Sequence, residues 1–448
     1  MKQGRRRRAG ALSLVLVLAL AHSFGCGRES RPVGDPRPGP RPGETPPDTS
    51  TRILSAYRAL PAVYYGSPAL SPDERTVYIG TSLWHFATPQ SNHAFVALNT
   101  ATGGVRWRYE LGAGIVRSSP AVAADGSVYF MVEGRNPTPD SLAAEVLCRF
   151  SSDGRLLWSR NINPTGVTTE VGLSAPAIGA DGSVYAAGDR LYAFRPDGSL
   201  KWAQFEPTFE ARHNSPVIGR DGTVYFVFHN IPLTALDPDD GSILWSCPLG
   251  VNDHCFSSPG IGADGTLYVT TQPGLVYAVS SAGQILWQFD IASAGFQGFL
   301  RSSPAVDADG TIYFGLNFGS PSSALFALKS DGTVRWIFEP HDLPADVPGD
   351  HFDIYSSPAI GSDSSIYFGQ ELGRVYSLNP ADGSVRWMQA THSGITWSSP
   401  ALAAGGSLFI GDLDGYCYSI RVASRGLKAT AAWPKYRGDN QNSGRAGP

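Results

Sequence analysis

The sequence predicts an all-β fold, an eight-bladed β-propeller whose blades each contain four strands. Three repeated signals in the 448-residue chain carry this prediction. A Ser-Pro or Ala-Pro element recurs eight times, a turn and a short aromatic strand follow it, and a strand with a tryptophan ends seven of the units. Successive tryptophans in these strands lie 42 to 51 residues apart. Four short strands in each stretch of about 40–50 residues are typical of a propeller blade.

The strands of one repeat, labelled a to d, follow from its residues in order. Strand a begins at the Ser-Pro element, whose prolines are Pro68, Pro120, Pro176, Pro216, Pro259, Pro304, Pro358 and Pro400. Turns such as Asp125-Gly126 lead into strand b, because glycine accepts the positive φ of a tight hairpin turn. After strand c, another glycine turn leads into strand d, which carries Trp107, Trp158, Trp202, Trp245, Trp287, Trp336 or Trp387. No segment predicts a helix.

The eighth blade lacks a clear d strand of its own, so one terminus is expected to complete it. Residues 51–59 precede blade one and can close the ring from the N-terminal side. Residues 431–436 are the alternative, with Trp433 in the missing position. Either closure pairs the last open sheet edge, and we favour the N-terminal strand. The predicted propeller therefore spans residues 51–426, and residues 427–448 form a tail that can dock on the last blade.

The N-terminus predicts export. Basic residues precede an apolar run over residues 11–21, which is shorter than the roughly 20 residues that span a bilayer. Residues 1–25 are therefore predicted to be a signal peptide. The small residue before Cys26 is typical of a lipidation site, and an ordinary signal peptide is the alternative. Residues 26–50 follow as the lipidated cysteine and a proline-rich tether with too little apolar surface to fold.

Charge and cysteine content limit the function classes. Without residues 1–25 the chain has 30 Lys and Arg against 39 Asp and Glu, a formal charge of −9, which argues against a nucleic-acid binder. The remaining cysteines, Cys148, Cys247, Cys255 and Cys417, have no metal-type spacing. Cys247 and Cys255 can pair in an oxidising compartment, but we favour four single buried thiols.

The strand c to strand d segment resembles the tryptophan-docking motif of the pyrroloquinoline-quinone (PQQ) quinoproteins, Ala-x-Asp-x-x-x-Gly-x-x-x-Trp. Residues 235–245 match it in full, and residues 97–107 match it with Asn99 in place of the Asp. The resemblance covers residues 60–420 and implies that each tryptophan wedges between its own blade and the next. The order of signal, cysteine, tether and eight blades is similar to that of the BamB family of outer-membrane assembly lipoproteins.

The candidate binding site lies on the face formed by the b–c and d–a loops, whose lengths vary most. Residues shortly before the Ser-Pro elements should line the mouth of the central funnel: Tyr65, Arg117, His213, Asn214, His254, Phe256, Arg301, Tyr355 and Trp397. Aromatic and arginine side chains there suit an anionic or planar ligand or a partner protein, although they can also simply pack under loops. The acidic loop 341–353 is expected to be solvated rather than to bind a cation, so no metal site is predicted.

The sequence is consistent with two functions. The favoured one is a non-catalytic binding or protein-interaction scaffold in the bacterial cell envelope, with no catalytic residues and no cofactor. Its expected partners are envelope proteins or polysaccharide, and its expected location is the periplasm, the outer membrane or the cell surface, as a lipid-anchored monomer. The alternative is a PQQ- and calcium-dependent dehydrogenase of alcohols or sugars. The family's alcohol dehydrogenases carry two adjacent cysteines, and no two cysteines are adjacent here.

Overall fold

A computed structural model describes residues 52–447, with gaps at 59–65, 83–92, 112–113, 134–144, 165–173, 206–213, 228–231, 251–254, 321 and 341–352. The predicted signal peptide, Cys26 and the tether lie outside the described residues. No helix in the described part of the chain has the length and apolar character needed to cross a membrane.

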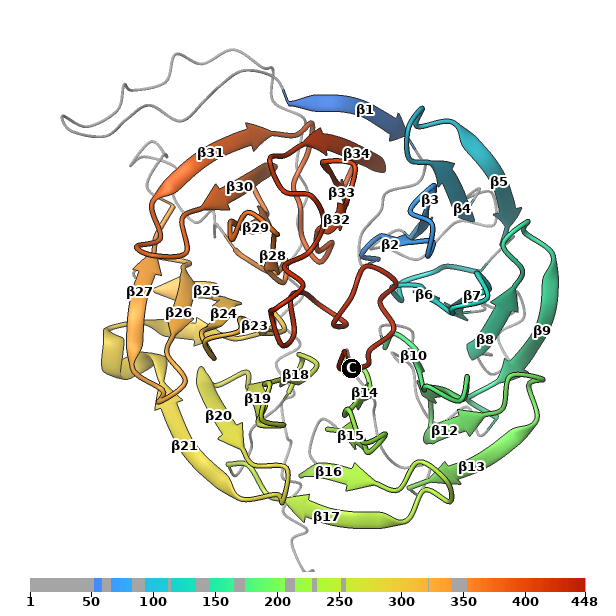
Figure 1. Ribbon diagram of the computed structural model, residues 1–448, viewed down its shortest axis with the longest axis horizontal. Coiled ribbons are helices and arrows are strands. Elements are labelled where there is room, and N and C mark those ends of the chain that lie inside the picture. Colours follow the sequence, from blue (N-terminus) through green and yellow to red (C-terminus); the bar gives the residue numbers. More distant parts are fainter. Residues whose placement is uncertain are drawn as a thin grey trace, which may run out of the picture. The chain divides into compact units, whose positions relative to one another are not determined.

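Eight four-stranded antiparallel sheets form a ring, with strand a of each sheet innermost and strand d outermost (Figure 1). This confirms the predicted eight-bladed propeller. The first four blades are β2 (Ala69–Leu70), β3 (Thr76–Gly80), β4 (Ala94–Asn99) and β5 (Val105–Glu110); β6 (Ala121–Val122), β7 (Val128–Glu133), β8 (Glu145–Phe150) and β9 (Leu156–Asn161); β10 (Ala177–Ile178), β11 (Val184–Ala187), β12 (Leu191–Phe194) and β13 (Leu200–Gln204); and β14 (Val217–Ile218), β15 (Val224–Phe226), β16 (Leu233–Leu236) and β17 (Ile243–Cys247).

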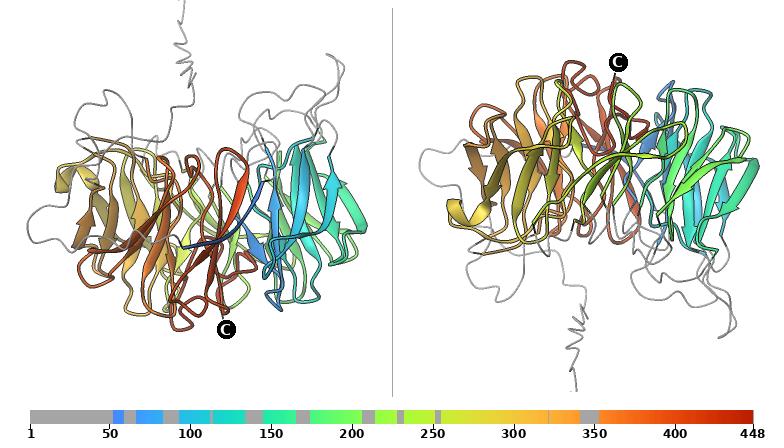
Figure 2. Two further views of the ribbon diagram at one scale, coloured as in Figure 1. Left: turned by 90° about the horizontal axis from the view of Figure 1, so that it is seen from above. Right: turned by 90° about the horizontal axis from the view of Figure 1, so that it is seen from below.

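The other four blades complete the ring, and their strands run between its two faces (Figure 2). They are β18 (Gly260–Ile261), β19 (Leu267–Thr270), β20 (Leu275–Val279) and β21 (Ile285–Asp290); β23 (Ala305–Val306), β24 (Ile312–Gly315), β26 (Leu325–Leu328) and β27 (Val334–Phe338); β28 (Ala359–Ile360), β29 (Ile366–Gln370), β30 (Arg374–Leu378) and β31 (Val385–Ala390); and β32 (Ala401–Ala403), β33 (Ser407–Gly411), β34 (Tyr416–Arg421) and β1 (Ile53–Arg58). A 3₁₀ turn, η1 (Ile291–Ala294), is the one helical element among the described residues.

The N-terminal strand β1 closes the eighth blade. It pairs antiparallel with β34, from Ile53 opposite Ile420 to Arg58 opposite Tyr416. The favoured N-terminal closure is therefore confirmed. Arg52, just before this strand, places its guanidinium 5.0 Å from the Trp387 ring of blade seven, so the closing strand also contacts the preceding blade.

The C-terminal tail lies at the centre of the ring, against the inner strands (Figure 1). In seven blades, the residue two places after the Ser-Pro proline donates its backbone N–H to the tail. The donors are Leu70, Val122, Ile178, Ile218, Val306, Ile360 and Leu402. Trp433 exchanges two backbone hydrogen bonds with Val306 and is 1 % exposed. The alternative in which Trp433 fills the outer position of blade eight is therefore wrong, because this residue is an inner anchor.

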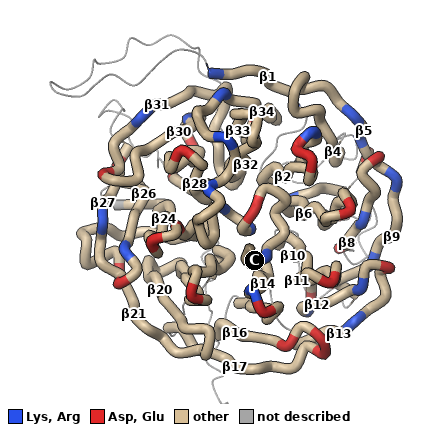
Figure 3. The backbone as a smooth tube through the Cα atoms, viewed as in Figure 1, with Lys and Arg blue, Asp and Glu red and all other residues tan. Residues whose placement is uncertain are grey.

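Polar side chains of the tail bind carbonyls that the inner strands leave free. Figure 3 shows where the charged residues of the chain lie along the backbone. Arg437 donates to the carbonyls of Pro216 and Pro176 at 2.7 and 2.9 Å. Asn442 donates through Nδ2 to the carbonyls of Pro68 and Pro120, and it accepts from Lys435 Nζ through Oδ1 at 2.6 Å. Buried polar groups need such partners, and here the tail and the ring supply them to each other.

The serine before each proline links neighbouring blades. The backbone N–H of Ser67 donates to Ser119 Oγ at 2.8 Å, and the corresponding bond from Ser399 to Ser67 Oγ joins blade eight to blade one at 3.0 Å. Five further links of this kind run from blade three to blade eight. The link from blade two to blade three has no counterpart, because Ala175 stands at that position without a hydroxyl. The repeated Ser-Pro element thus builds a hydrogen-bonded ring around the channel.

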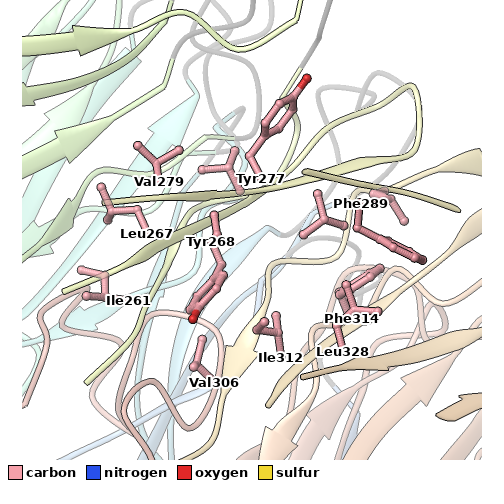
Figure 4. Packing of buried hydrophobic residues seen from close by; sticks show 14 of the residues in the cluster. Ile261, Leu267, Tyr268, Tyr277, Val279, Phe289, Val306, Ile312, Phe314 and Leu328 are labelled. Carbon is pink, nitrogen blue, oxygen red and sulfur yellow. The ribbon is translucent and has the colours of Figure 1, made fainter. Parts of the chain in front are cut away.

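The d-strand tryptophans lie between blades. Six of them donate Nε1–H to a backbone carbonyl of the next blade at 2.8 to 3.0 Å: Trp107, Trp158, Trp202, Trp245, Trp287 and Trp336. Gly241, with φ at 75°, lies against the Trp202 ring, and a Cβ there would come within 2.7 Å of it. Trp202, Trp336 and Trp387 are buried, while the other four are half-buried. Beneath them, strands b and c supply the core, as Leu267 and Tyr268 do against Ile312 and Phe314 in Figure 4.

Candidate functional site

One position of the repeat, three residues before the Ser-Pro proline, gathers at the mouth of the central channel. Arg117, Arg301, Tyr355 and Trp397, all predicted to belong to the funnel mouth, line a single hollow together with Phe256. Serines of the hydrogen-bonded ring and Tyr436 of the tail also line it. The hollow contains about 400 Å³ of space, part of it open to solvent. Tyr65, His213 and His254 lie outside the described residues.

Arg301 carries the main positive charge of this hollow. Its guanidinium carbon lies 5.0 Å from the centre of the Phe256 ring and 5.5 Å from each of the Phe299 and Phe318 rings. These distances are within the roughly 6 Å range of cation–π attraction. No carboxylate of the described residues forms an ion pair with this guanidinium, and Nε is buried without an acceptor. The cation is held by aromatic rings rather than by an anion.

Two loops supply two of these rings: the connection from blade five to blade six carries Phe299, and the b–c loop of blade six carries Phe318. β22 (Gln297–Phe299) pairs with β25 (Asn317–Ser320) to form a small separate sheet. Asn317 Oδ1 accepts the backbone N–H of Arg301 at 3.1 Å, and Asp353 accepts the backbone N–H of Phe318. Phe318 has φ at 50°, a left-handed conformation that a bulky residue seldom adopts. The position of the Phe318 ring is therefore set by its surroundings.

The aromatic lining continues across blades seven and eight. The Phe318 and Tyr355 rings meet edge to face at 6.0 Å, and the Tyr355 and Trp397 rings lie 4.8 Å apart. Burial raises the pKa of Tyr355 above its usual range, and the nearby Asp353 and Glu371 raise it further, so the phenol stays protonated. We call the side chains of Phe256, Arg301, Phe318, Tyr355 and Trp397 the aromatic arc.

The opposite side of the hollow has a different character. Arg117 forms an ion pair with Glu133 at 3.5 Å, which compensates its charge within the protein. Glu145, the partner of Glu133 in the β7–β8 ladder, is 3 % exposed and neither of its carboxylate oxygens has a hydrogen bond. Burial raises the pKa of Glu145 well above its usual range, and the charges of Glu133 and Asp189 add to the effect.

Some residues that line the hollow or surround Arg301 lie outside the predicted set. Phe299 and Phe318 belong to loops with no repeat signal, so periodicity could not place them over Arg301. Tyr436 comes from the tail, where its hydroxyl lies 3.4 Å from Ser215 Oγ. Phe256 belongs to the predicted mouth set, and its spacing from Pro259 is the same as that of Arg301 from Pro304. Counting three residues back from the proline therefore selects Phe256 rather than His254, which stands two residues earlier.

The described residues do not match a PQQ and calcium site. Cys148, Cys247, Cys255 and Cys417 are four separate buried thiols with no disulfide, as favoured from the sequence. Across the described ranges, no group of three or more His, Cys, Asp or Glu side chains is placed to hold a metal ion. The acidic loop lies outside these ranges except for Asp353, whose Oδ1 accepts from Phe318 N–H and Ser323 Oγ.

Comparison with known proteins places this geometry in a family. The family model described as outer membrane protein assembly factor BamB matches residues 66–231 and 232–432. BamB of Yersinia pestis is 32 % identical over 222 residues, which are 45 % of this chain and 51 % of that protein. The chain thus spans about half the length of the curated relative it matches.

Solved structures agree on the fold. BamB from Moraxella catarrhalis superposes with a TM-score of 0.59 at 15 % identity, covering 83 % of this chain and 99 % of that one. The quinohemoprotein alcohol dehydrogenase from Comamonas testosteroni gives 0.61 at 13 % identity, covering 84 % and 77 %. At such identities the likeness is one of fold alone. Because the family model covers most of the propeller in two consecutive matches, the chain belongs to the BamB family of β-propeller proteins.

Proposed function

We propose that this protein is a non-catalytic scaffold of the bacterial cell envelope, held to a membrane by lipid at Cys26, which binds a partner protein at the mouth of its central channel. The observation that carries the proposal is the hollow itself. A rigid, hydrogen-bonded ring presents four unlike side chains, Arg117, Arg301, Tyr355 and Trp397, at equivalent places of four blades. Tyrosine, tryptophan and arginine are the residues that most often dominate binding at protein interfaces.

Membership of the BamB family supports an envelope role, since the Yersinia pestis relative is named for outer membrane protein assembly. The tail supports the choice of face. It lies against the inner strands near the ends that lead into the a–b turns, and Tyr436 limits the hollow from within. A partner therefore has access to the channel from the side of the b–c and d–a loops.

Site-specific photo-crosslinking in cells tests the proposal. A photoreactive amino acid replaces Trp397 in the hollow or, as the control, Leu244, which is 52 % exposed on the outer strand β17. We expect the probe at 397 to capture one defined envelope protein, and the same probe combined with Arg301→Gln to lose most of that product. Equal products from both positions would refute the channel mouth as the binding site.

The lipid anchor has its own test. Cells labelled with a palmitate analogue should incorporate it into the wild-type protein and not into Cys26→Ser. Cys148→Ser is the matched control, because this thiol is buried in blade two and should leave labelling unchanged. Incorporation into Cys26→Ser would contradict the assignment of the lipid to Cys26. An unlabelled wild type would leave an ordinary signal peptide as the alternative.

A further inference from the structure

We infer that the hollow is a receptor for a carboxylate group, and that the Arg301 guanidinium is the group that receives it. This inference rests on the proposed function and names the chemistry that the channel mouth recognises. The ligand is a carboxylate presented by a partner protein, on an acidic side chain or at a chain terminus, or by a small free acid.

The first argument is the balance of charge around Arg301. The other arginine of the hollow, Arg117, has its carboxylate partner Glu133 at 3.5 Å. Asp353, the acidic residue beside Tyr355, uses Oδ1 to accept from Phe318 N–H and Ser323 Oγ. Among the described residues, no acceptor hydrogen-bonds to the Arg301 side chain. A guanidinium in a partly enclosed site normally has an anionic or carbonyl partner, so a ligand is the expected source.

The second argument is orientation. The guanidinium carbon lies 5.0 to 5.5 Å from the ring centres of Phe256, Phe299 and Phe318. A cation–π contact is made with the face of a ring and does not use up an N–H donor in a hydrogen bond. A guanidinium has five N–H donors in a planar fork that matches the two oxygens of a carboxylate. These three rings thus hold the cation in place and leave N–H donors for a ligand in the hollow.

The third argument is that the arrangement is present before any ligand binds. Asn317 fixes the backbone at Arg301, and Asp353 holds Phe318 in its left-handed conformation. Strained backbone of this kind persists only where neighbouring contacts enforce it, and it is concentrated at functional sites. A preformed site loses little conformational entropy on binding, so even one charged contact can contribute to affinity.

Size and charge favour a carboxylate over a phosphate. The hollow is small, because its roughly 400 Å³ of space includes open solvent and the enclosed part is less than a typical ligand site offers. It suits a short side chain rather than a large cofactor. Only Arg301 offers an uncompensated positive charge among the described residues of the hollow, which matches a singly charged carboxylate better than a phosphate dianion. The chain as a whole is acidic, with a formal charge of −4, so the attraction must be local.

Calorimetric titration of the purified full-length protein tests the inference. The probes are a short peptide with one glutamate and blocked ends, the same peptide with glutamine, sodium acetate and inorganic phosphate. The variants are Arg301→Gln and Arg301→Lys. Arg335→Gln is the matched control, because Arg335 lies on the outer strand β27 and forms an ion pair with Asp309. We expect the glutamate peptide to bind the wild type and Arg335→Gln equally, and Arg301→Gln roughly 10- to 100-fold more weakly, as for the loss of a charged hydrogen bond.

Each outcome decides the question. Tighter binding of the glutamate peptide than of acetate supports a protein source for the carboxylate, and equal binding per carboxylate supports a small free acid. Intermediate affinity of Arg301→Lys, which keeps the charge and loses the fork, supports the assigned geometry. The inference is overturned if the glutamine peptide binds equally, if only phosphate binds, if Arg301→Gln binds like the wild type, or if no probe binds. Because the purified protein needs no cellular partner for this titration, failure here is separable from failure of the crosslinking test.

Discussion

Trp433 is predicted to anchor the tail that closes the inner side of the propeller, and Trp433→Ala tests this. The side chain is 1 % exposed and packs in the core cluster that includes Val306, Ile312 and Leu328. Truncating a buried tryptophan to alanine costs about 3–5 kcal/mol, from lost apolar burial and the cavity left behind. Because the tail joins seven blades through their inner strands, we expect this cost to weaken docking of the whole tail.

Hydrogen exchange measures that docking directly. The backbone N–H groups of Leu70, Val122, Ile178 and Ile218 donate to carbonyls of the tail, so their protection depends on it. If the tail opens as one unit, a loss of 3 kcal/mol or more speeds exchange of these amides at least about a hundredfold. Ile261 of blade five serves as an internal reference, because its N–H makes no hydrogen bond to the described part of the tail.

Trp245→Ala is the control. It removes a tryptophan of similar size from the outer strand β17, and exchange at Leu70 and Val122 should stay at the wild-type rate. The reasoning fails if Trp433→Ala lowers global stability while the four tail-bonded amides keep their protection. In that case the polar contacts of Arg437 and Asn442 alone would hold the tail.

Three further predictions concern stability. Glu145 has a raised pKa in the folded protein, so the wild type should lose stability relative to Glu145→Gln as pH rises above the usual glutamate range. Urea unfolding at pH 5 and pH 8 measures the difference in free energy of unfolding between the two proteins. A difference that is the same at both pH values would contradict the prediction. Burial lowers the pKa of Lys435 to about 7, although the charge of Asp439 opposes the shift. Above that pH the folded state binds fewer protons than the unfolded state, so the free energy of unfolding should rise from pH 7 toward pH 10. Lys435→Met should not show this rise. Ala175→Ser should add the missing interblade link and raise the free energy of unfolding by about 1 kcal/mol, whereas no gain would show that the donor is already satisfied.

The blades could be predicted from the sequence because each is a local structure. Turn residues, strand periodicity and the tryptophan all lie within one repeat of about 40–50 residues, so a short-range pattern is sufficient. The closing strand β1 could also be anticipated, since seven tryptophan strands left one sheet edge open. Its contact with Trp387 through Arg52 could not, because this depends on where the strand enters the ring.

The tail and the small sheet at the mouth were beyond the reach of pattern analysis for a physical reason. The tail binds through long-range contacts, such as Asn442 with Pro68, and most of its partners are backbone groups that every residue type offers equally. β22 and β25 have no repeat to mark them, and Phe318 adopts a backbone conformation that its residue type disfavours. Such features follow from tertiary context rather than from local propensity.

The repeats also indicate where this propeller can change its ligand without changing its fold. The position before the proline is serine in seven of eight blades, and its hydroxyl is needed for the links between blades. The position two residues earlier faces the mouth of the channel in those blades for which the structure describes this residue. It is Tyr65, Arg117, Leu173, His213, Phe256, Arg301, Tyr355 and Trp397 around the ring. Since the hydrogen bonds between blades are made by the neighbouring serines, substitutions at this position can alter what the channel binds and leave those links in place.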